Sequence, residues 1–248
     1  MKKITLVLSS ALLMIATSCS TTAHKVHWGY TGHEGPSNWG SLSSDYKICS
    51  LGKNQSPINV THSLNANLAP IEFSYTTAPT DIINNGHTVQ INIAKGSYIV
   101  VDNKKYELKQ YHFHTPSENH IDNKSFPLEA HFVHAAGNGE LAVVAVLFEY
   151  GKDNKTLAKL WEKMPMHTNE KHELNNIAKN LMTLIPTNTQ YYRFNGSLTT
   201  PPCSEGVKWM VLGKNLKVSK AQIEKFSHAV GGHNNRPIQP LNARVIVK

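Results

Sequence analysis

Three histidines stand at a spacing that could hold a metal ion. His112 and His114 are separated by one residue, and His131 follows 17 positions after His114. On a β-strand, residues i and i+2 point to the same side, so His112 and His114 can direct two imidazoles to one point while a neighbouring strand brings the third. Three neutral imidazoles are the protein ligands of a catalytic zinc ion that keeps its fourth tetrahedral position for water. The spacing therefore predicts a catalytic zinc site.

A fourth histidine, His134, lies three residues after His131. On a helix these two side chains would be neighbours, whereas on a strand they face opposite sides. Phe132 and Val133, followed by a long run of β-forming residues, favour the strand. We therefore expect only His131 to reach the metal, and His134 to be a hydrogen-bonded structural histidine.

The rest of the chain is typical of a mainly β (α+β) protein with a few peripheral helices. An apolar stretch at 142–148 has no polar face, which predicts a central strand. Ser219, followed three residues later by Gln222, is a candidate capping box for a helix. The β-branched and aromatic runs predict strands at 71–75, 89–93, 98–101, 107–114, 128–134, 142–150, 191–194, 207–212 and 244–247. Helices are predicted at 156–164, 173–184 and 219–230.

Length and composition fit one globular domain at 26–248, preceded by a short tether at 19–25. The 248 residues are 40% hydrophobic, and the net charge of +8 falls to +6 when residues 1–18, with two lysines and no acid, are removed. A basic charge can attract an acidic surface or an anionic ligand, but we favour a role in solubility. The lysines are scattered, so no nucleic-acid partner is expected.

The N-terminus resembles an export signal, with Lys2 and Lys3 before an apolar run at 4–16 that is too short to span a bilayer. Two cleavage sites are open. Cleavage after Ser18 would leave Cys19 as a lipidated first residue, as in bacterial lipoproteins, and cleavage after Ala23 would leave no anchor. The sequence therefore predicts an exported protein in the periplasm, with a lipid anchor at Cys19 as one of the two outcomes.

Two cysteines, Cys49 and Cys203, remain in the domain. In an exported protein this count suggests one disulfide, and the alternative is two unpaired buried thiols. A bridge between them would close a loop of about 154 residues, which the chain-entropy treatment values at roughly 5 kcal/mol, an upper figure.

A series of short motifs resembles the α-class carbonic anhydrases, in order and over nearly the whole chain after residue 26. Each motif is weak alone, but the ordered set is specific. The motifs are His27-Trp28-Gly29-Tyr30, Gly35-Pro36, Gln55-Ser56-Pro57-Ile58-Asn59, Asn84-Asn85-Gly86-His87, Gln110-Tyr111-His112-Phe113-His114, Pro116-Ser117-Glu118, Glu129-Ala130-His131-Phe132-Val133-His134, Asn195-Gly196-Ser197-Leu198-Thr199-Thr200-Pro201-Pro202 and Arg236-Pro237-Ile238-Gln239-Pro240.

The resemblance implies a single domain around a large, twisted, mostly antiparallel sheet, with Zn²⁺ held by His112, His114 and His131 in a conical cleft. It implies the reversible hydration of carbon dioxide to bicarbonate and a proton by zinc-bound hydroxide. Cys49 and Cys203 match positions that are bridged in exported members of the family. The oligomeric state stays open, a homodimer included.

The resemblance also assigns residues that hold the ligands. Gln110 and Glu129 lie two residues before His112 and His131, on the same strand faces, and would accept hydrogen bonds from them. The alternative for both is a polar side chain that only faces solvent. His114 would use a backbone carbonyl.

Thr199 and Glu118 would orient the nucleophile. By the resemblance, Thr199 accepts its proton and donates its own hydroxyl proton to Glu118, because an ionised carboxylate only accepts. Taken alone, Thr199 would be a turn residue and Glu118 a loop charge.

Carbon dioxide is small and apolar, so its site should be an apolar pocket beside the metal. Val133 lies two residues beyond His131 and on the same strand face. The resemblance adds Val143, Leu198, Thr200 and Trp209. The alternative for these side chains is ordinary core packing.

The proton released must leave the site, and a histidine that titrates near neutrality can carry it. His87 follows a turn signal and matches the proton-shuttle position of the family, although a solvated turn histidine would look the same. Tyr30, Asn85 and Gln90 would hold the intervening waters. Gln90 stands where asparagine is usual.

Two other functions compete with this one. His112, His114 and Glu118 have the spacing of a cupin-type metal oxygenase, but Tyr106 stands where that family has glycine. A non-catalytic binding module on the same fold would be expected to lack at least one metal ligand, and all three are present.

Overall fold

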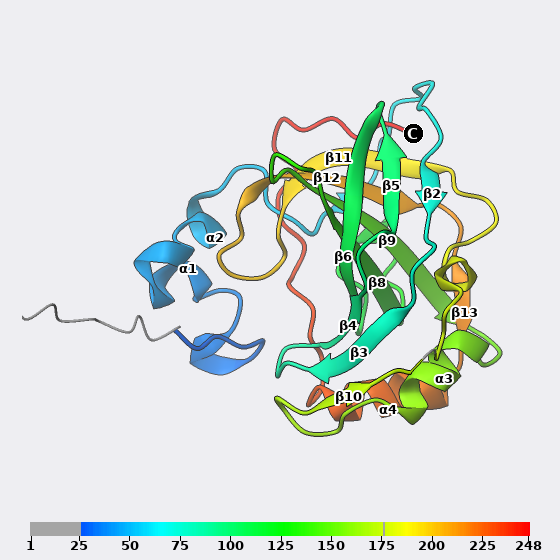
Figure 1. The fold of residues 1–248 in the computed structure, drawn as a ribbon. Helices are drawn as coiled ribbons and strands as arrows, with labels where there is room; N and C mark the ends of the chain where they lie inside the picture. The colour runs from blue at the N-terminus through cyan, green and yellow to red at the C-terminus, as the bar shows by residue number, and fades with distance from the viewer. Residues whose placement is uncertain (1–25, 176) are drawn as a thin grey trace, which may run out of the picture.

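A computed structural model describes residues 26–175 and 177–248, and strands dominate it (Figure 1). The predicted signal peptide, Cys19 and the tether lie outside the described residues. Eleven strands form one large sheet: β2 Glu72–Ser74, β3 Pro79–Asn84, β4 Val89–Ile93, β5 Tyr98–Val101, β6 Lys104–His114, β8 Leu128–Ala135, β9 Leu141–Tyr150, β10 Lys171–Glu173, β11 Tyr191–Ser197, β12 Glu205–Leu212 and β13 Leu216–Val218. A small parallel pair is formed by β1 Asn59–Val60 and β7 His120–Ile121.

The main path of the large sheet runs β10-β3-β4-β6-β8-β9-β12-β11, with β5 beside β6, β2 beside β5 and β13 beside β9. Most neighbouring strands are antiparallel, and only β12 and β13 pair with β9 in parallel. The mainly β, mostly antiparallel fold class is therefore confirmed. The prediction of a central strand is confirmed as well, since 142–148 of β9 is buried throughout and lies between β8 and β12.

The helices are short and lie at the margins of the sheet (Figure 1). They are α1 Trp39–Leu42, α2 Ile48–Leu51, α3 Lys155–Glu162 and α4 Lys220–Ala229, with 3-10 turns at η1 Gly32–Glu34, η2 Ser44–Tyr46 and η3 Leu181–Leu184. The Asn154 side chain caps α3, and the predicted capping box of Ser219 and Gln222 caps α4. Within the described residues, no helix combines the length and the apolar character needed to cross a bilayer.

Both faces of the sheet are covered. Successive side chains of a strand alternate between the two faces, so each face carries its own set of residues. On one face, residues such as Tyr111, Phe113 and Phe132 join Trp161 of α3 and Phe226 of α4 in the larger apolar core. The other face carries a smaller apolar cluster around Val143, Trp209 and Val211. The alternation sets His112, His114 and His131 on this second face.

Two predicted elements are wrong. The predicted helix at 173–184 is replaced by the end of β10, a series of turns and η3, because Asn175 and Ala178 adopt positive φ values that break a right-handed helix. The predicted strand at 244–247 makes only isolated bridges from Val247 to Leu64 and Arg193.

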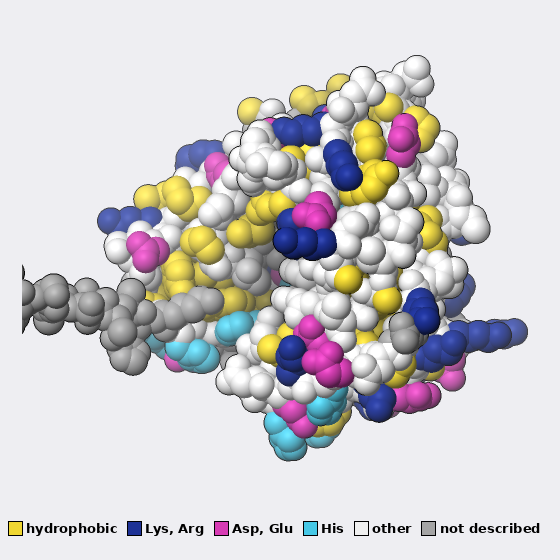
Figure 2. Space-filling model, in the orientation of Figure 1, with side chains coloured by type: hydrophobic (Ala, Val, Ile, Leu, Met, Phe, Trp, Pro, Cys, Tyr) yellow, Lys and Arg dark blue, Asp and Glu magenta, His cyan; other side chains and the backbone are white. Residues whose placement is uncertain are grey.

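Charged side chains are spread over the face shown in Figure 2, with lysines and arginines among acidic and uncharged residues. Some of these charges form ion pairs. Asp102 Oδ2 lies 2.6 Å from the Arg193 guanidinium and 2.7 Å from Lys208 Nζ. The expectation of no nucleic-acid partner stays a prediction.

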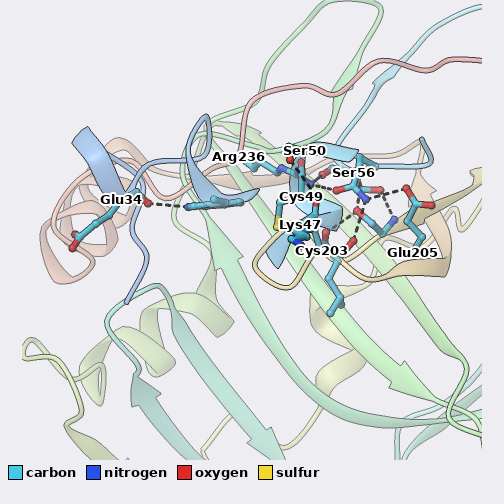
Figure 3. Close-up of a disulfide and its surroundings, with 12 residues drawn as sticks. Glu34, Lys47, Cys49, Ser50, Ser56, Cys203, Glu205 and Arg236 are labelled. Atoms are coloured by element: carbon cyan, nitrogen blue, oxygen red, sulfur yellow. Dashed lines mark hydrogen bonds between the residues drawn. A yellow bond between two sulfur atoms is a disulfide. The ribbon is translucent and has the colours of Figure 1, made fainter. Parts of the chain in front are cut away.

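A disulfide joins Cys49 to Cys203 across 154 residues of sequence, as predicted. Beside it lies the buried Arg236 (Figure 3). The Arg236 guanidinium donates to the Gln55 side chain at 2.9 Å, to the Ser56 carbonyl at 2.8 Å and to the Cys49 carbonyl at 2.8 Å. The disulfide thus fastens the N-terminal segment to the loop that follows β11, and the guanidinium fastens the same segment to the part of the chain that carries Arg236.

Reduction of the disulfide should lower the free energy of unfolding by up to roughly 5 kcal/mol, because a long loop of the unfolded chain is released. Urea unfolding with and without a thiol reductant measures the difference. A double Cys49→Ser, Cys203→Ser variant is the control, since reductant should not change its midpoint. An equal midpoint for the reduced and oxidised wild type would contradict the prediction.

His134 is a buried structural histidine, as predicted. Its Nε2 is 2.9 Å from the Tyr75 hydroxyl and its Nδ1 is 3.3 Å from the Ala142 carbonyl oxygen. Burial lowers the pKa of His134 to about 3, although the carbonyl groups of Ala142 and Phe132 oppose that shift. The folded protein therefore keeps this imidazole neutral at pH values where an unfolded chain would protonate it.

Neutral His134 should contribute fully to the free energy of unfolding above about pH 6.5. Below that pH the contribution should fall by about 1.4 kcal/mol for each pH unit, until the pKa of His134 in the folded protein is reached. The His134→Gln variant has no titrating group at this position. The difference in unfolding free energy between wild type and variant, measured by urea unfolding at several pH values, should shrink steadily below pH 6.5. A difference that does not vary with pH would rule the assignment out.

Candidate metal centre

Three histidines meet on the second face of the sheet because β6 and β8 pair in the register that brings them together. His112 lies directly opposite His131, and His114 lies opposite Glu129. One ligand atom from each histidine lies within 4.8 Å of the other two. His114 and His131 are each 1% exposed and His112 is half-buried, so solvent reaches the group from the His112 side.

One ring nitrogen of each histidine faces an oxygen acceptor, which decides which nitrogen is left for a metal. His112 Nδ1 is 2.8 Å from Gln110 Oε1, and His131 Nε2 is 2.9 Å from Glu129 Oε1. His114 Nδ1 is 2.7 Å from the backbone oxygen of Asn234. The remaining nitrogens are Nε2 of His112, Nε2 of His114 and Nδ1 of His131. His114 Nε2 is buried without a hydrogen-bond partner among the described residues, and the contact of His131 Nε2 with Glu129 is an ion-pair distance without hydrogen-bond geometry.

The electrostatics of the group keep the imidazoles neutral. Burial lowers the pKa of His112 and of His131 well below the ordinary value, and neighbouring histidines lower it further. Burial also lowers the pKa of His114, against the opposing effect of the Asn234 carbonyl and Glu129. Neutral nitrogens with converging lone pairs are the donor set of a zinc site that has three protein ligands. The residues present therefore fit Zn²⁺.

Three hydrogen bonds hold the buried carboxylate of Glu129. Its Oε2 accepts from the backbone N–H groups of Glu118 at 2.7 Å and Asn119 at 2.8 Å. Its Oε1 accepts from the Asn119 side chain at 2.7 Å. Burial raises the pKa of Glu129, and these hydrogen bonds oppose the rise. The carboxylate is thereby fixed beside His131.

Glu118 lies next to the histidines and has one free oxygen. Its Oε1 accepts from the backbone N–H of Arg236 at 2.8 Å, whereas its Oε2 lies 3.5 Å from His114 Nε2 and 3.9 Å from His131 Nδ1. Burial raises the pKa of Glu118, and polar contacts with Arg236 and the Thr199 side chain oppose the rise. Thr199 and Glu118 therefore lie together, as predicted.

Thr199 is buried in the loop that follows β11. The backbone N–H of Leu198 donates to the Ser204 carbonyl at 3.0 Å, and that of Cys203 donates to the Thr200 carbonyl at 2.8 Å. Because Cys203 is also bridged to Cys49, the loop is fixed at the end that follows Thr199 and Thr200.

The predicted apolar pocket residues come together beside His131. Val143 of β9 pairs with Val133 on β8 and with Trp209 on β12, so the three side chains form one row across the sheet. Leu198 packs against the same cluster. The Trp209 and His131 rings lie 4.9 Å apart at 80°. Thr200 is partly exposed at the start of the loop.

The residues predicted for proton transfer lie on the β3–β4 turn and on the N-terminal segment. The His87 ring stacks on Trp28, with centroids 3.7 Å apart and planes 6° apart. Asn85 Oδ1 accepts from the backbone N–H groups of His87 at 3.0 Å and Thr88 at 2.9 Å, so this atom is used by the turn itself. The predicted role of Asn85 with water can involve only its Nδ2 and leftover acceptor capacity.

Tyr30 and Gln90, the other two residues predicted to hold water, lie outside the turn that carries Asn85. The Tyr30 hydroxyl is buried and has no hydrogen-bond partner among the described residues, and burial together with Glu118 raises the pKa of Tyr30. Gln90 pairs with His112 across β4 and β6.

Sequence reasoning missed Asn234, which joins the histidine group to the turn that carries His87. Its backbone oxygen faces His114, and its side chain donates to the carbonyls of His87 at 3.0 Å and Phe113 at 2.9 Å. Asn234 Oδ1 accepts from the Thr115 N–H at 2.8 Å. A backbone carbonyl leaves no mark on residue type, so only the nearby Arg236-Pro237 motif pointed to this segment.

Comparison with known proteins agrees with this geometry. Residues 34–248 match the family model of the eukaryotic-type carbonic anhydrases. A carbonic anhydrase of Neisseria gonorrhoeae is 49% identical over 244 residues, covering 97% of this chain and 96% of that protein. A carbonic anhydrase of Pectobacterium atrosepticum is 46% identical, over 96% of this chain and 98% of that protein.

Solved structures show the same fold. The α-carbonic anhydrase of Thermovibrio ammonificans, in complex with the inhibitor sulfanilamide, has a TM-score of 0.88 and 46% identity, over 91% of this chain and 100% of that one. The α-carbonic anhydrase of Photobacterium profundum has a TM-score of 0.85 and 48% identity, over 90% and 100% of the two chains. These matches do not favour the cupin alternative. The family model, the sequence relatives and the solved structures together show that this chain belongs to the eukaryotic-type, or α-class, carbonic anhydrase family of enzymes.

Proposed function

We propose that this chain catalyses the reversible hydration of carbon dioxide to bicarbonate and a proton, with Zn²⁺ held by His112, His114 and His131. One observation carries the proposal: three neutral imidazole nitrogens lie within 4.8 Å of one another, next to an apolar row and a buried carboxylate. When bound, Zn²⁺ would lower the pKa of a coordinated water molecule, and its charge would favour the ionised form of nearby acids.

Gln110, Glu129 and the Asn234 carbonyl hold the three ligands in one tautomer. Gln110 and the Asn234 carbonyl accept hydrogen bonds from the nitrogens of His112 and His114 that face away from the common point. The Glu129 carboxylate lies 2.9 Å from His131 Nε2 and favours a proton on that nitrogen, so each facing nitrogen keeps its lone pair. A protonated imidazole has no lone pair to give to a metal. These acceptors therefore both aim the rings and select the protonation state that binds.

Thr199 and Glu118 orient the nucleophile. The charge of a bound Zn²⁺ would oppose the burial that raises the pKa of Glu118 and would favour its ionised form. An ionised Glu118 only accepts, so the Thr199 hydroxyl would donate to it and keep its own lone pairs for the nucleophile. A nucleophile that donates its proton to Thr199 directs its remaining lone pair at carbon dioxide. The loop that carries Thr199 needs little reorganisation, because the Cys49–Cys203 bridge fixes it.

The row of Val133, Val143 and Trp209, with Leu198, gives carbon dioxide an apolar surface next to His131. Such a surface favours the uncharged substrate over charged bicarbonate, whose burial there would be costly. Thr200, partly exposed in the loop that also carries Leu198 and Thr199, would be the polar contact for the product.

His87 transfers the proton between the site and the solvent, and Tyr30, Asn85 and Gln90 order the waters between them. The imidazole lies against Trp28 at the end of a turn whose backbone is anchored by Asn234. Histidine is the side chain whose unperturbed pKa suits the transfer of a proton near neutral pH.

We also propose that the enzyme acts outside the cytoplasm, exported by the signal at residues 1–18. The Cys49–Cys203 bridge supports this proposal, because such bridges persist in oxidising compartments. Labelling with palmitate of the wild type and a Cys19→Ala variant tests whether the export signal ends in a lipid anchor.

Removal of zinc should abolish carbon dioxide hydration, and re-addition of one equivalent should restore it. Stopped-flow hydration with chelator-treated and zinc-reloaded protein measures this effect, alongside metal analysis of the purified protein. His112→Ala should lose both zinc and activity, whereas His134→Gln, at the histidine on the opposite face, should retain both. Full activity in a metal-free preparation, or iron in place of zinc, would contradict the proposal.

Val143→Tyr should block hydration while zinc stays bound, because a ring in the middle of the apolar row occupies the surface assigned to carbon dioxide. Activity and zinc content are measured on the same preparation. Leu147→Met, two rungs further along the same face of β9, is a matched control that should remain active. A fully active Val143→Tyr variant would show that the substrate binds elsewhere.

His87→Ala should slow turnover in weak buffer by about tenfold or more, since positioned proton transfer contributes about 10²–10⁴-fold to enzymatic rates. Added imidazole should restore much of the loss by carrying the proton instead. Turnover by stopped flow over a series of imidazole concentrations is the measurement. An unchanged rate in weak buffer would remove His87 from the proton path.

A further inference from the structure

A row of polar side chains runs from the histidine group to the edge of the sheet. Gln90 of β4 lies opposite His112 of β6, and Asn92 lies two residues further along the same face of β4. Gln90 Nε2 donates to Asn92 Oδ1 at 2.8 Å. Asn92 Nδ2 in turn donates to Asp81 Oδ1 at 2.7 Å, across the β3–β4 pair.

The direction of every hydrogen bond in this row is set by Asp81. A carboxylate only accepts, so Asn92 must present its amide nitrogen to Asp81 and its amide oxygen to Gln90. Gln90 must then present its own nitrogen to Asn92. The other oxygen of Asp81 accepts from the Thr80 hydroxyl at 2.8 Å and lies 3.8 Å from Lys171 Nζ, so only donors approach it.

Two charged side chains of β10 lie close to Asp81. Glu173 lies opposite it on β10, and Lys171 lies between the two acids, 3.6 Å from Glu173 Oε1. The side chain of Asp81 is 10% exposed, so the Thr80 and Asn92 hydrogen bonds replace most of its water.

The far end of the row is the Gln90 oxygen. Gln90 is half-buried, and its Oε1 forms no hydrogen bond within residues 26–175 and 177–248. Since Nε2 is committed to Asn92, Oε1 is the atom that Gln90 offers to solvent on the face that carries His112. Water that reaches Oε1 therefore meets a fixed acceptor, although the second N–H of Nε2 remains a donor.

We propose that Asp81, acting through Asn92, is a positioning residue that fixes the Gln90 amide as a hydrogen-bond acceptor toward the waters of the proton path. The proposal rests on the proposed transfer of a proton to His87. A chain of waters passes a proton only when its hydrogen bonds all run one way, and an amide that flips between donor and acceptor interrupts that order. A carboxylate two side chains away removes the flip.

The Asp81→Asn variant tests this device. The new amide at position 81 can donate as well as accept, so Asn92 and Gln90 gain a second, reversed arrangement. We expect turnover in weak buffer to fall several-fold and added imidazole to restore it, while kcat/KM for carbon dioxide stays unchanged. We also expect the side-chain amide resonances of Gln90 to broaden or double in ¹⁵N NMR spectra, where the wild type gives one sharp pair.

An exchange of the two residues is the sharpest control. The double variant Asp81→Asn, Asn92→Asp places the carboxylate at position 92, where it again accepts from Gln90 and forces the wild-type orientation. Turnover and the single pair of Gln90 resonances should both return. Lys171→Met, which removes a neighbouring charge but leaves the carboxylate in place, should leave turnover and the Gln90 resonances unchanged.

Two results would overturn the proposal: a single unchanged Gln90 resonance pair in Asp81→Asn, or a folded exchange variant that stays slow. If Asp81→Asn does not fold, a through-hydrogen-bond coupling from Gln90 Nε2 to the Asn92 side-chain carbonyl in the wild type decides the orientation, and its absence refutes it. Failure of the proton path itself is seen separately, as unchanged turnover in His87→Ala with the Gln90 orientation intact.

Discussion

The structure depends on holding three imidazole nitrogens close together in a buried place while none of them carries a proton. Unpaired polar atoms away from water cost free energy, and His114 Nε2 has no partner among the described residues. Strand pairing and hydrogen bonds hold the three imidazoles in place despite this cost. Strand pairing sets His112 opposite His131, and an oxygen acceptor behind each ring fixes its tautomer. Under the proposed function, binding of a divalent ion would remove this cost.

The acceptors behind the rings are themselves held by distant parts of the chain. Glu129 receives three hydrogen bonds from the segment of Glu118 and Asn119, and Glu118 receives one from Arg236. Arg236 reaches the Cys49 carbonyl, and Cys49 is bridged to Cys203 in the loop of Thr199. Five separate segments of sequence are therefore tied into one support for the site. This arrangement holds the site on a rigid frame, which keeps the functional groups in position.

Much of the fold and the site could be predicted from the sequence because they depend on local sequence patterns. The i and i+2 spacing of His112 and His114, the apolar run of β9 and the capping box of α4 are all short-range signals, and each is confirmed. Where the signal was weak, prediction failed. The 173–184 segment has apolar residues at helical spacing, but Asn175 and Ala178 turn the backbone the other way.

Strand β3, which the sequence did not predict, shows the same limit. β3 begins with Pro79 and contains Asp81, a composition that argues against a strand, and it forms because β4 and β10 pair with it on both sides. Asn234 acts on His114 through its backbone, which no residue type reveals. The orientation imposed by Asp81 on Gln90 depends on contacts between strands, so it could be read only from the structure.

X-ray absorption at the zinc edge of the zinc-loaded protein tests the central claim most directly. The account predicts one zinc per chain with three imidazole nitrogens at about 2.0–2.1 Å and one further light ligand, and loss of this signature in His112→Ala. Zinc bound by sulfur, zinc surrounded by six oxygens, or a spectrum that His112→Ala leaves unchanged would contradict it.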